Sequence, residues 1–181
     1  MQIGSKPTFF YYSSEDLLLV ETLNIDSTWI NQLRKAIVHL FDDLGDHVIF
    51  RSINNAWYQL LPDLPGNRLW TPLLLQYVLK FYGKDVGAHT IQALPNQNYS
   101  ILHCMIVSVD SEVQTFQDAV IAYLTEDEIP QREFSVDGLR EVLIKGKMIA
   151  GNELSGSLHT ALADDLRFTW SIDGKQVTIK V

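Results

Sequence analysis

Apolar residues recur at helical spacing over several stretches of the chain, and most of these stretches begin with a helix-capping signal. Asp26 or Ser27 can cap the clearest stretch, because a short polar side chain accepts hydrogen bonds from the free N–H groups of a first helical turn. Thr71 and Pro72 supply a cap and a first helical position to another stretch. The pattern predicts helices over residues 15–23, 28–44, 54–61, 71–82, 113–125, 135–145 and 153–166. The predicted helix ends are Gly45, Gly83 and Gly146, and the predicted capping box is Ser111 with Gln114.

Other parts of the chain have the patterns of strands. Residues 8–13 are aromatic and predict an opening strand, and residues 48–50 predict a short one. Residues 101–109 alternate poorly, so a buried strand and a buried helix both fit them. Asp173-Gly174 separates two runs in which apolar and polar residues alternate, 168–172 and 177–181. An Asp-Gly pair between such runs is the strongest short-range signal for a β-hairpin. The predicted inward faces of this hairpin are Phe168, Trp170 and Ile172, and Val177, Ile179 and Val181.

From Ser135 onward the predicted order is helix, turn, helix and two-stranded hairpin. This order resembles the winged-helix superfamily over Ser135 to Val181, with the hairpin as the wing. The resemblance lies in the order of elements and implies the fold. In winged helices that bind DNA, the second helix of the pair enters the major groove.

The region before residue 131 has a related order of predicted elements. Helix 28–44, strand 48–50 and helices 54–61 and 71–82 suggest a second winged-helix-type unit, and we hold a tandem arrangement as a hypothesis. The fold class is therefore expected to be α+β and mainly helical. We expect a mainly helical acidic domain over 1–130 and a winged-helix-like module over 131–181, joined near an acidic segment that contains Pro130.

The distribution of charge leaves the expected fold of the module unchanged, but it argues against nucleic-acid binding by the module. Residues 1–130 contain seven Lys and Arg against fifteen Asp and Glu, whereas residues 131–181 contain seven of each kind. Nucleic-acid binders need cations, because contacts to phosphates supply most of their non-specific affinity. The predicted second helix, 153–166, has three outward carboxylates and neither Lys nor Arg, which favours a protein contact over a DNA groove.

A nucleic-acid interface on this module would have to use polar side chains of the second helix and cations near the wing. The residues in question are Ser155, Ser157, His159, Thr160, Arg167, Lys175 and Lys180.

The remaining signals for chemistry are weak. His103 and Cys104 are adjacent, so their side chains diverge and do not form a working dyad, and Cys104 is expected to be buried. The histidines lack metal-ligand spacing, so no metal site is expected, and the acids at 42, 43 and 46 are interpreted as a solvated patch. Phosphate-binding glycine loops and G-x-S-x-G are absent from the sequence. At least three of Trp29, Trp57, Trp70 and Trp170 are expected in the core.

These observations favour a non-enzymatic interaction or regulatory protein that uses winged-helix-type modules for protein contact or assembly. A DNA- or RNA-binding transcriptional regulator is the alternative, and an enzyme built around His103 or His89 has no support from spacing. No cofactor is expected. The partner is expected to be another protein or a second copy, with nucleic acid as the alternative and no membrane. The single cysteine and the lack of a signal peptide or a long apolar run favour the cytoplasm.

Overall fold

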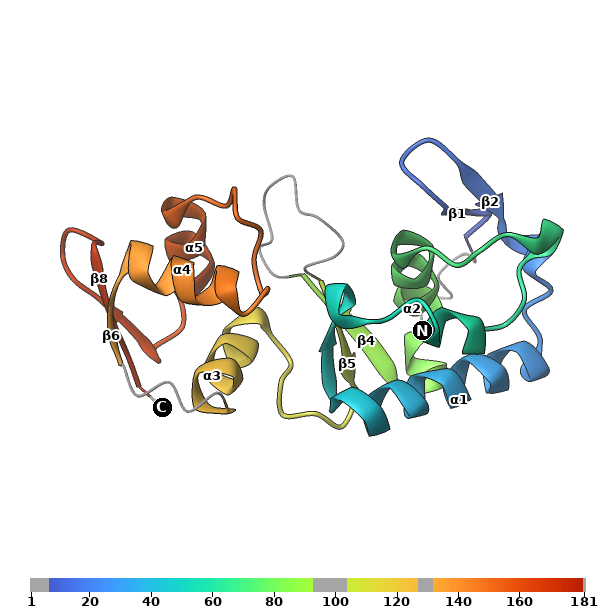
Figure 1. Cartoon of the computed structure of the whole chain (residues 1–181), viewed down its shortest axis with the longest axis horizontal. Helices are drawn as coiled ribbons and strands as arrows, with labels where there is room; N and C mark the ends of the chain where they lie inside the picture. Colours follow the sequence, from blue (N-terminus) through green and yellow to red (C-terminus); the bar gives the residue numbers. More distant parts are fainter. Residues whose placement is uncertain (1–6, 93–103, 127–131, 181) are drawn as a thin grey trace, which may run out of the picture. The chain divides into compact units, whose positions relative to one another are not determined.

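The chain forms two compact α+β units. The computed structural model describes residues 7–92, 104–126 and 132–180. One unit comprises residues 1–90 with 106–110, and the other comprises residues 91–105 with 111–181. In each unit, helices pack beside a small sheet (Figure 1). Helix α3 (Phe116–Glu126) packs on helix α5 (Ser155–Leu162). It therefore lies in the second unit, whereas the sequence prediction had placed it in the first domain.

The N-terminal unit opens with a β-hairpin of β1 (Phe9–Tyr11) and β2 (Leu17–Leu19). The predicted opening strand is thus confirmed. The predicted helix over 15–23 is wrong, because its leucines pair with β1 and are followed by a 3-10 turn over Val20–Leu23. Phe10 and Leu18 face each other across the hairpin and are buried.

Two long helices, α1 (Ser27–Leu44) and α2 (Pro72–Val86), pack together in this unit. Both predicted caps are confirmed. The Asp26 carboxylate accepts from the Trp29 N–H at 2.8 Å, and the Thr71 hydroxyl accepts from the Leu74 N–H at 3.1 Å. The buried residues of the two helices are Trp29, Leu33, Ala36, Ile37, Leu40, Leu74, Leu75, Val78, Leu79, Gly83 and Val86.

The predicted end of α2 at Gly83 is wrong. The helix continues to Val86, and Gly87 ends it in the left-handed region with φ of 79°. A Cβ on Gly83 would lie 2.3 Å from the Ala88 carbonyl oxygen, so this glycine allows a close approach of the returning chain. A glycine inside a helix is easily taken for a stop when it serves packing instead.

A three-stranded sheet completes the unit, with β5 (Met105–Ser108) between β3 (His47–Ile49) and β4 (Ala88–Ile91). The strand alternative for 101–109 therefore holds over 105–108, and residues 101–103 lie outside the described residues. Between β3 and α2 the chain makes 3-10 turns, and the predicted helix over 54–61 is wrong because only a short 3-10 turn forms there. These turns span Phe50–Ser52, Trp57–Leu60 and Pro65–Asn67.

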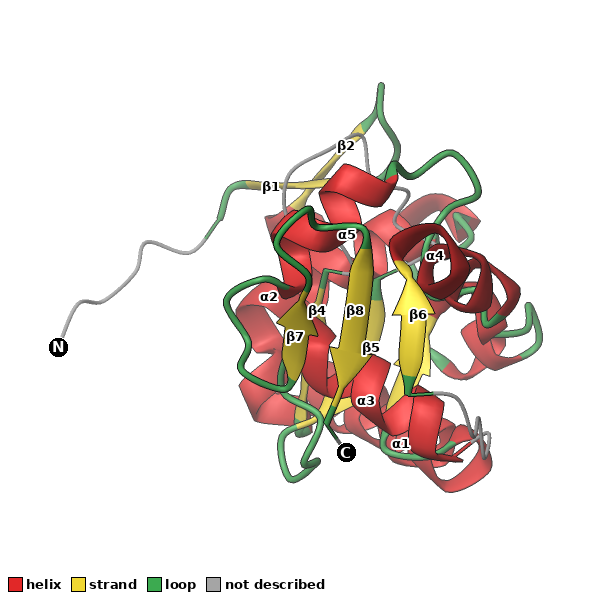
Figure 2. Ribbon diagram, turned by 90° about the vertical axis from the view of Figure 1, so that its left-hand side faces the viewer, coloured by secondary structure: helices red, strands yellow, loops and turns green. Residues whose placement is uncertain are grey.

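The C-terminal unit contains a sheet in which β8 (Gln176–Ile179) lies between β6 (Glu133–Ser135) and β7 (Phe168–Trp170). Both pairings are antiparallel, and Figure 2 shows β8 in the middle. Helix α4 (Val136–Lys145) begins at the predicted cap, since the Ser135 hydroxyl accepts from the Gly138 N–H at 3.0 Å. Gly146 follows it, as predicted. Strand β6 was missed, because it is short and has one buried residue.

The predicted hairpin forms, but its turn is longer than Asp173-Gly174. The Ser171 N–H donates to the Gln176 carbonyl at 3.0 Å, so the turn covers residues 172–175. Gly174 adopts φ of 68°, which glycine takes without strain. Ile172 lies in this turn and is fully exposed, contrary to its predicted inward position.

Helices α3 and α5 are shorter than predicted. Leu154 and Leu166 lie outside α5 and are 69% and 90% exposed, whereas the prediction had placed both in its apolar stripe. The predicted Ser111–Gln114 capping box is wrong, because the Ser111 hydroxyl accepts from Val113 in a turn before α3. Thr115 precedes α3 instead.

Two of the four tryptophans lie in the core. Trp29 and Trp57 are buried, whereas Trp70 and Trp170 are half-buried, so the expectation of at least three core tryptophans is wrong. Cys104 is buried, as predicted.

Over residues 7–92, 104–126 and 132–180, no helix combines the length and the apolar character needed to cross a membrane.

Candidate nucleic-acid interface

Helix α5 positions four of the seven residues proposed for nucleic-acid contact. Leu158 and Leu162 anchor its inner face in the core, which directs polar side chains outward. Two of the hydroxyls are occupied. Ser155 donates to the Asp137 carboxylate, and Thr160 donates to the Gly156 carbonyl of its own helix at 3.0 Å. The predicted interface residues on α5 are Ser155, Ser157, His159 and Thr160, and only Thr160 among them is classed as exposed.

His159 belongs to the junction between α5 and the hairpin. Its ring meets the Trp170 ring edge-on, with ring centroids 4.3 Å apart and planes at 66°. A Cβ added to Gly174 would lie 3.6 Å from His159 Nε2, so the hairpin turn also approaches this ring. The side chain therefore packs the wing-like hairpin against α5 and does not project as a reader of base edges.

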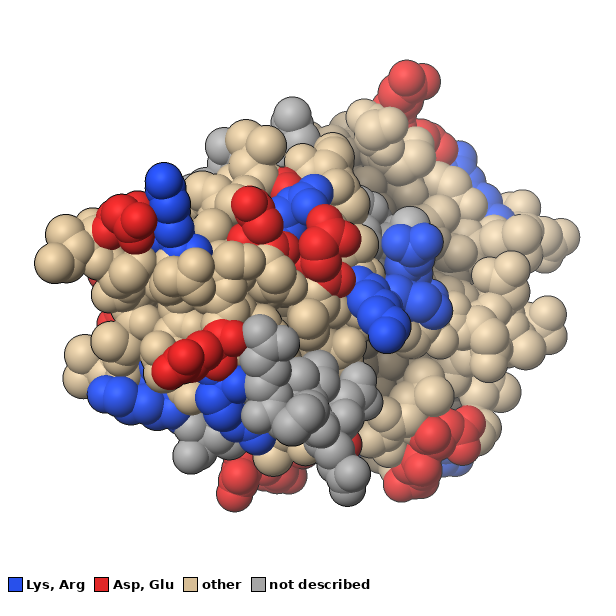
Figure 3. Space-filling model, turned by 60° about the vertical axis from the view of Figure 1, so that its left-hand side comes forward, with Lys and Arg blue, Asp and Glu red and all other residues tan. Residues whose placement is uncertain are grey.

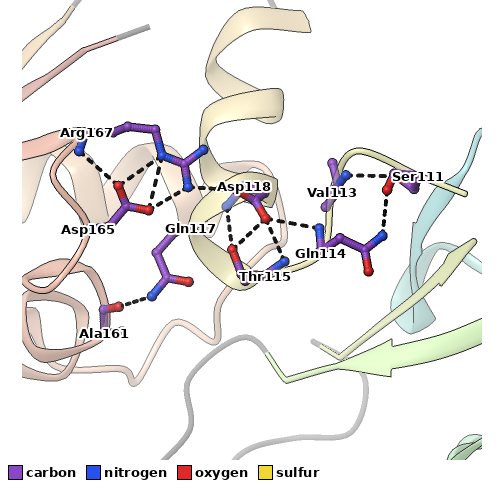
Figure 4. A network of polar contacts seen from close by, with 9 residues as sticks. All are labelled: Ser111, Val113, Gln114, Thr115, Gln117, Asp118, Ala161, Asp165 and Arg167. Atoms are coloured by element: carbon purple, nitrogen blue, oxygen red, sulfur yellow. Dashed lines mark hydrogen bonds and ion pairs between the residues drawn. The ribbon is translucent and has the colours of Figure 1, made fainter. Parts of the chain in front are cut away.

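Arg167, the predicted cation nearest α5, is engaged by two carboxylates (Figure 4). Its Nη2 lies 2.5 Å from Asp165 Oδ2 and 2.7 Å from Asp118 Oδ1, and its Nε lies 3.0 Å from Asp165 Oδ1. Hydrogen bonds from Arg167 lower the pKa of Asp165. Two acids around one guanidinium give the site a net negative charge, which opposes phosphate binding.

Asp118 serves two structural tasks at once. Its Oδ2 accepts from the backbone N–H of Thr115 at 2.9 Å and of Gln114 at 3.1 Å, while the Asp118 N–H donates to the Thr115 hydroxyl at 3.1 Å. Burial by itself raises the pKa of Asp118, but the hydrogen bonds from Thr115 and Arg167 outweigh it and lower the pKa. The residue therefore caps α3 and also holds the chain that follows α5.

A further bond joins the same two helices, since Gln117 Nε2 donates to the Ala161 carbonyl at 2.7 Å. Sequence reasoning missed this network. One part of it had a visible signal, because Thr115-x-x-Asp118 before an apolar run is a capping-box spacing. The bond to Arg167 had none, since the partners are 49 positions apart.

Lys175 and Lys180 are both exposed, but they stand at opposite ends of β8. The two residues are five positions apart, which corresponds to about 17 Å along an extended chain at the usual rise per residue. On the side of the molecule drawn in Figure 3, Lys and Arg form small separate groups rather than one continuous stripe. The two lysines of the hairpin are thus separated from each other, and Lys180 lies beside Arg167, whose guanidinium is already paired with two carboxylates.

The candidate groups for metal or catalytic chemistry are histidine and acidic side chains. Within the described ranges, no group of three His, Cys, Asp or Glu side chains is placed to hold a metal ion. His39 pairs with Asp43 at 3.3 Å, and His47 pairs with Asp46 at 2.8 Å, so acids of the predicted solvated patch have local partners. His89 is partly buried, which lowers its pKa, and His103 lies outside the described residues.

Comparison of the chain with protein-family models, with curated proteins and with solved structures found no match.

Proposed function

We propose that the protein is a non-enzymatic interaction or regulatory protein that uses two winged-helix-type modules for protein contact or assembly. One observation carries the proposal, which is the arrangement that the two units share. The order in the C-terminal unit is α3, β6, α4, α5, β7 and β8, with β8 in the middle of its sheet. After its opening β1–β2 hairpin, the order in the N-terminal unit is α1, β3, 3-10 turns, α2, β4 and β5, with β5 in the middle of the three-stranded sheet.

The correspondence supports the tandem hypothesis. In both units a helix precedes the first strand of the three-stranded sheet, another helix precedes its last two strands, and the last strand separates the other two. The units differ in the middle, where 3-10 turns take the place of α4. A second module requires helices 28–44 and 71–82 to pack together, and α1 and α2 do pack together.

The charge of the candidate interface favours a protein partner, or a second copy, over nucleic acid. Arg167 is occupied by two carboxylates, and Lys175 and Lys180 lie far apart along β8. Large apolar side chains stand exposed at the ends of α5 and at the hairpin turn instead, namely Leu154, Leu166 and Ile172. A protein partner can bury such exposed apolar side chains, which favours a protein contact. The proposal includes a cytoplasmic location, because the one cysteine needs no oxidising compartment.

Binding to duplex DNA tests the proposal directly. We expect no saturable change in the fluorescence anisotropy of a labelled duplex at about 50 mM salt, where phosphate contacts are strongest. Tight binding that falls steeply by about 200 mM salt would overturn the proposal in favour of a nucleic-acid regulator. In that case Lys175→Glu with Lys180→Glu should weaken binding, and Lys35→Glu, an exposed lysine of the other unit, is the matched control.

Sedimentation velocity tests the contact surface. We expect the chain to self-associate as its concentration rises, and Ile172→Asp with Leu166→Asp to weaken that association without changing the melting temperature. Val38→Asp, at an exposed apolar residue of α1, is the matched control. A monomer at every concentration would restrict the proposal to a different protein as partner.

A further inference from the structure

The β1–β2 hairpin of the N-terminal unit, drawn in blue in Figure 1, is apolar on both faces. Its inner face is buried. Its outer face consists of the residues that alternate with the buried ones: Phe9, Tyr11, Leu17 and Leu19. Three of them are about half exposed, with 50% for Phe9, 46% for Tyr11 and 48% for Leu17. Antiparallel strands with one face in water usually carry polar residues on that face, so this outer face has the character of a contact surface.

The edge of the hairpin at β2 offers backbone groups to another strand. In the described part of the chain the hairpin is a sheet of two strands, and α2 packs against β1. The Val20 N–H donates to the Thr8 carbonyl at 2.9 Å, and bonded positions alternate along an antiparallel pair. The backbone groups of Leu17 and Leu19 therefore point away from β1. The Thr22 hydroxyl donates to the Leu19 carbonyl at 2.6 Å, and the other three groups bond to no described residue.

The charge around the hairpin is negative. Residues 8–33 contain four acids and neither Lys nor Arg. Glu15 and Glu21 lie on either side of β2 in the sequence, are exposed and form no ion pair with a described residue. Arg68 does reach the hairpin from the loop before α2, but it is already paired with Asp16 at 2.8 Å. A partner with positive charge beside its apolar residues is therefore attracted to this surface.

The size and the charge of the outer face both disfavour a second copy as its occupant. A fully buried aromatic side chain covers about 150–250 Å², so three half-exposed large side chains offer roughly 300 Å². A stable interface between folded proteins needs about 800 Å² from each partner. Residues 1–130 carry fifteen acids against seven cations, so two copies of this region repel each other. A short segment of opposite charge meets neither obstacle.

We propose that the β1–β2 hairpin binds an extended segment of another protein, with alternating apolar residues at its centre and Lys or Arg at both ends. The segment pairs with the open edge of β2 as a third strand. Its apolar side chains pack beside Leu17 on the outer face, and its cations are attracted by Glu15 and Glu21. The hairpin is separate from the exposed apolar residues of the C-terminal unit, so the inference goes beyond the proposed function and does not depend on it.

Isothermal titration calorimetry on the full chain tests the inference, with the acetylated and amidated peptide Lys-Lys-Val-Thr-Val-Thr-Val-Lys-Lys as the probe. Valine and threonine favour an extended chain. We expect saturable binding that weakens several-fold between about 50 and 300 mM salt, because salt screens exposed charges. One control peptide has Glu in place of every Lys, and another has N-methyl groups on its valines, which removes the donors that pair with β2. Each should bind about tenfold more weakly or worse.

The Leu17→Thr variant locates the peptide on the outer face. Threonine keeps the preference for a strand but removes apolar surface, so binding should weaken about fivefold. Leu44→Thr is the matched control, because Leu44 is 47% exposed on α1 and should not affect the peptide. The melting temperatures of both variants show whether they are folded.

A pair of charge variants tests the attraction. Glu15→Gln with Glu21→Gln should weaken binding at about 50 mM salt and make it less dependent on salt. Asp42→Asn with Glu112→Gln also removes two exposed acids, but away from the hairpin, and should leave the salt dependence as it is.

Absence of saturable binding by the lysine peptide, or equal binding of either control peptide, would overturn the inference. Unchanged binding by Leu17→Thr would place the peptide elsewhere and overturn it as well. Self-association that Leu17→Thr weakens in sedimentation velocity would make a second copy the occupant instead. Ile172→Asp, which tests the contact surface of the C-terminal unit, should not alter peptide binding, so the two proposals can fail separately.

Discussion

Each unit has its last strand in the middle of a three-stranded sheet, but the two units are stabilised by different kinds of interaction. The N-terminal unit relies on long helices, with 18 residues in α1 and 15 in α2, whose apolar faces pack together. The C-terminal unit has shorter helices, with 10 residues in α4 and 8 in α5. Short helices bury less apolar surface and gain less from propagation, so this unit depends more on specific bonds.

Both units contain buried polar atoms without a partner. These are the Trp29 indole nitrogen and the Tyr58 hydroxyl in the N-terminal unit and the Trp170 indole nitrogen in the C-terminal unit. In the C-terminal unit, Arg167 joins Asp165 and Asp118, and the latter also caps α3. Both units therefore tolerate orphaned polar atoms, and the difference is that the C-terminal unit, which has the shorter helices, is also reinforced by an ionic network.

Gly83→Ala should give the largest effect and tests the close packing of the N-terminal unit. The new methyl group would lie 2.3 Å from the Ala88 carbonyl oxygen, so the helix or the strand must shift. We expect a loss of about 3 kcal/mol in the free energy of unfolding, measured by urea titration followed by tryptophan fluorescence.

Gly156→Ala is the matched control in the C-terminal unit. Nothing lies within 4 Å of its added Cβ, so alanine in α5 should raise stability by about 0.5 kcal/mol. Equal effects of the two substitutions would contradict the difference in packing between the units.

Arg167→Met should have an intermediate effect, about 1 kcal/mol at pH 7, because it leaves two partly exposed carboxylates without their cation. Their folded pKa values are lowered from 3.8, so the stability they contribute is present above about pH 4 and is lost as the pH falls through the folded values. The difference in thermal stability between this variant and the unmodified chain should therefore shrink below pH 4.

Arg51→Met replaces an exposed arginine of the N-terminal unit. It should change neither the thermal stability at pH 7 nor its dependence on pH below about 4. If Arg167→Met left the acid limb unchanged too, the network would not stabilise the C-terminal unit.

Tyr58→Phe should have the smallest effect at neutral pH, within about 1 kcal/mol, because the hydroxyl has no partner to lose. The dependence of stability on pH in the alkaline range provides a sharper test. The folded pKa is raised from 10.0 to about 12, so the folded state keeps a proton that the unfolded state releases. Stability that Tyr58 contributes should fall as the pH rises from about 10 to 12, and the phenylalanine variant should lack that loss.

Tyr11→Phe serves as control for this profile, since Tyr11 lies about half exposed on β1. A loss well above 1 kcal/mol at pH 7 in Tyr58→Phe would show that the hydroxyl has a partner.

Local signals predicted the helix starts well. Asp26, Thr71 and Ser135 each cap the helix that their spacing indicated, because capping depends on residues within one turn. The Asp173-Gly174 hairpin formed for a similar reason, although its turn is longer. Gly83 was misinterpreted, because the Ala88 carbonyl that makes it necessary comes from the next element.

Features that depend on distant partners could not be predicted. The leucines of β2 read as a helix until β1 is known to pair with them. The interface proposed on α5 and the hairpin counted Arg167 as an available cation, but its partner Asp118 belongs to a helix far back in the chain.

The central position of the last strand has a consequence for synthesis on the ribosome. β3 and β4 are not neighbours in their sheet, and neither are β6 and β7, so each sheet has no paired strands until β5 or β8 is available. A nascent chain that has been translated as far as β4 therefore carries two strands with all their edges unpaired. We expect that interval to be the one in which the emerging protein is most exposed to aggregation and to binding by chaperones.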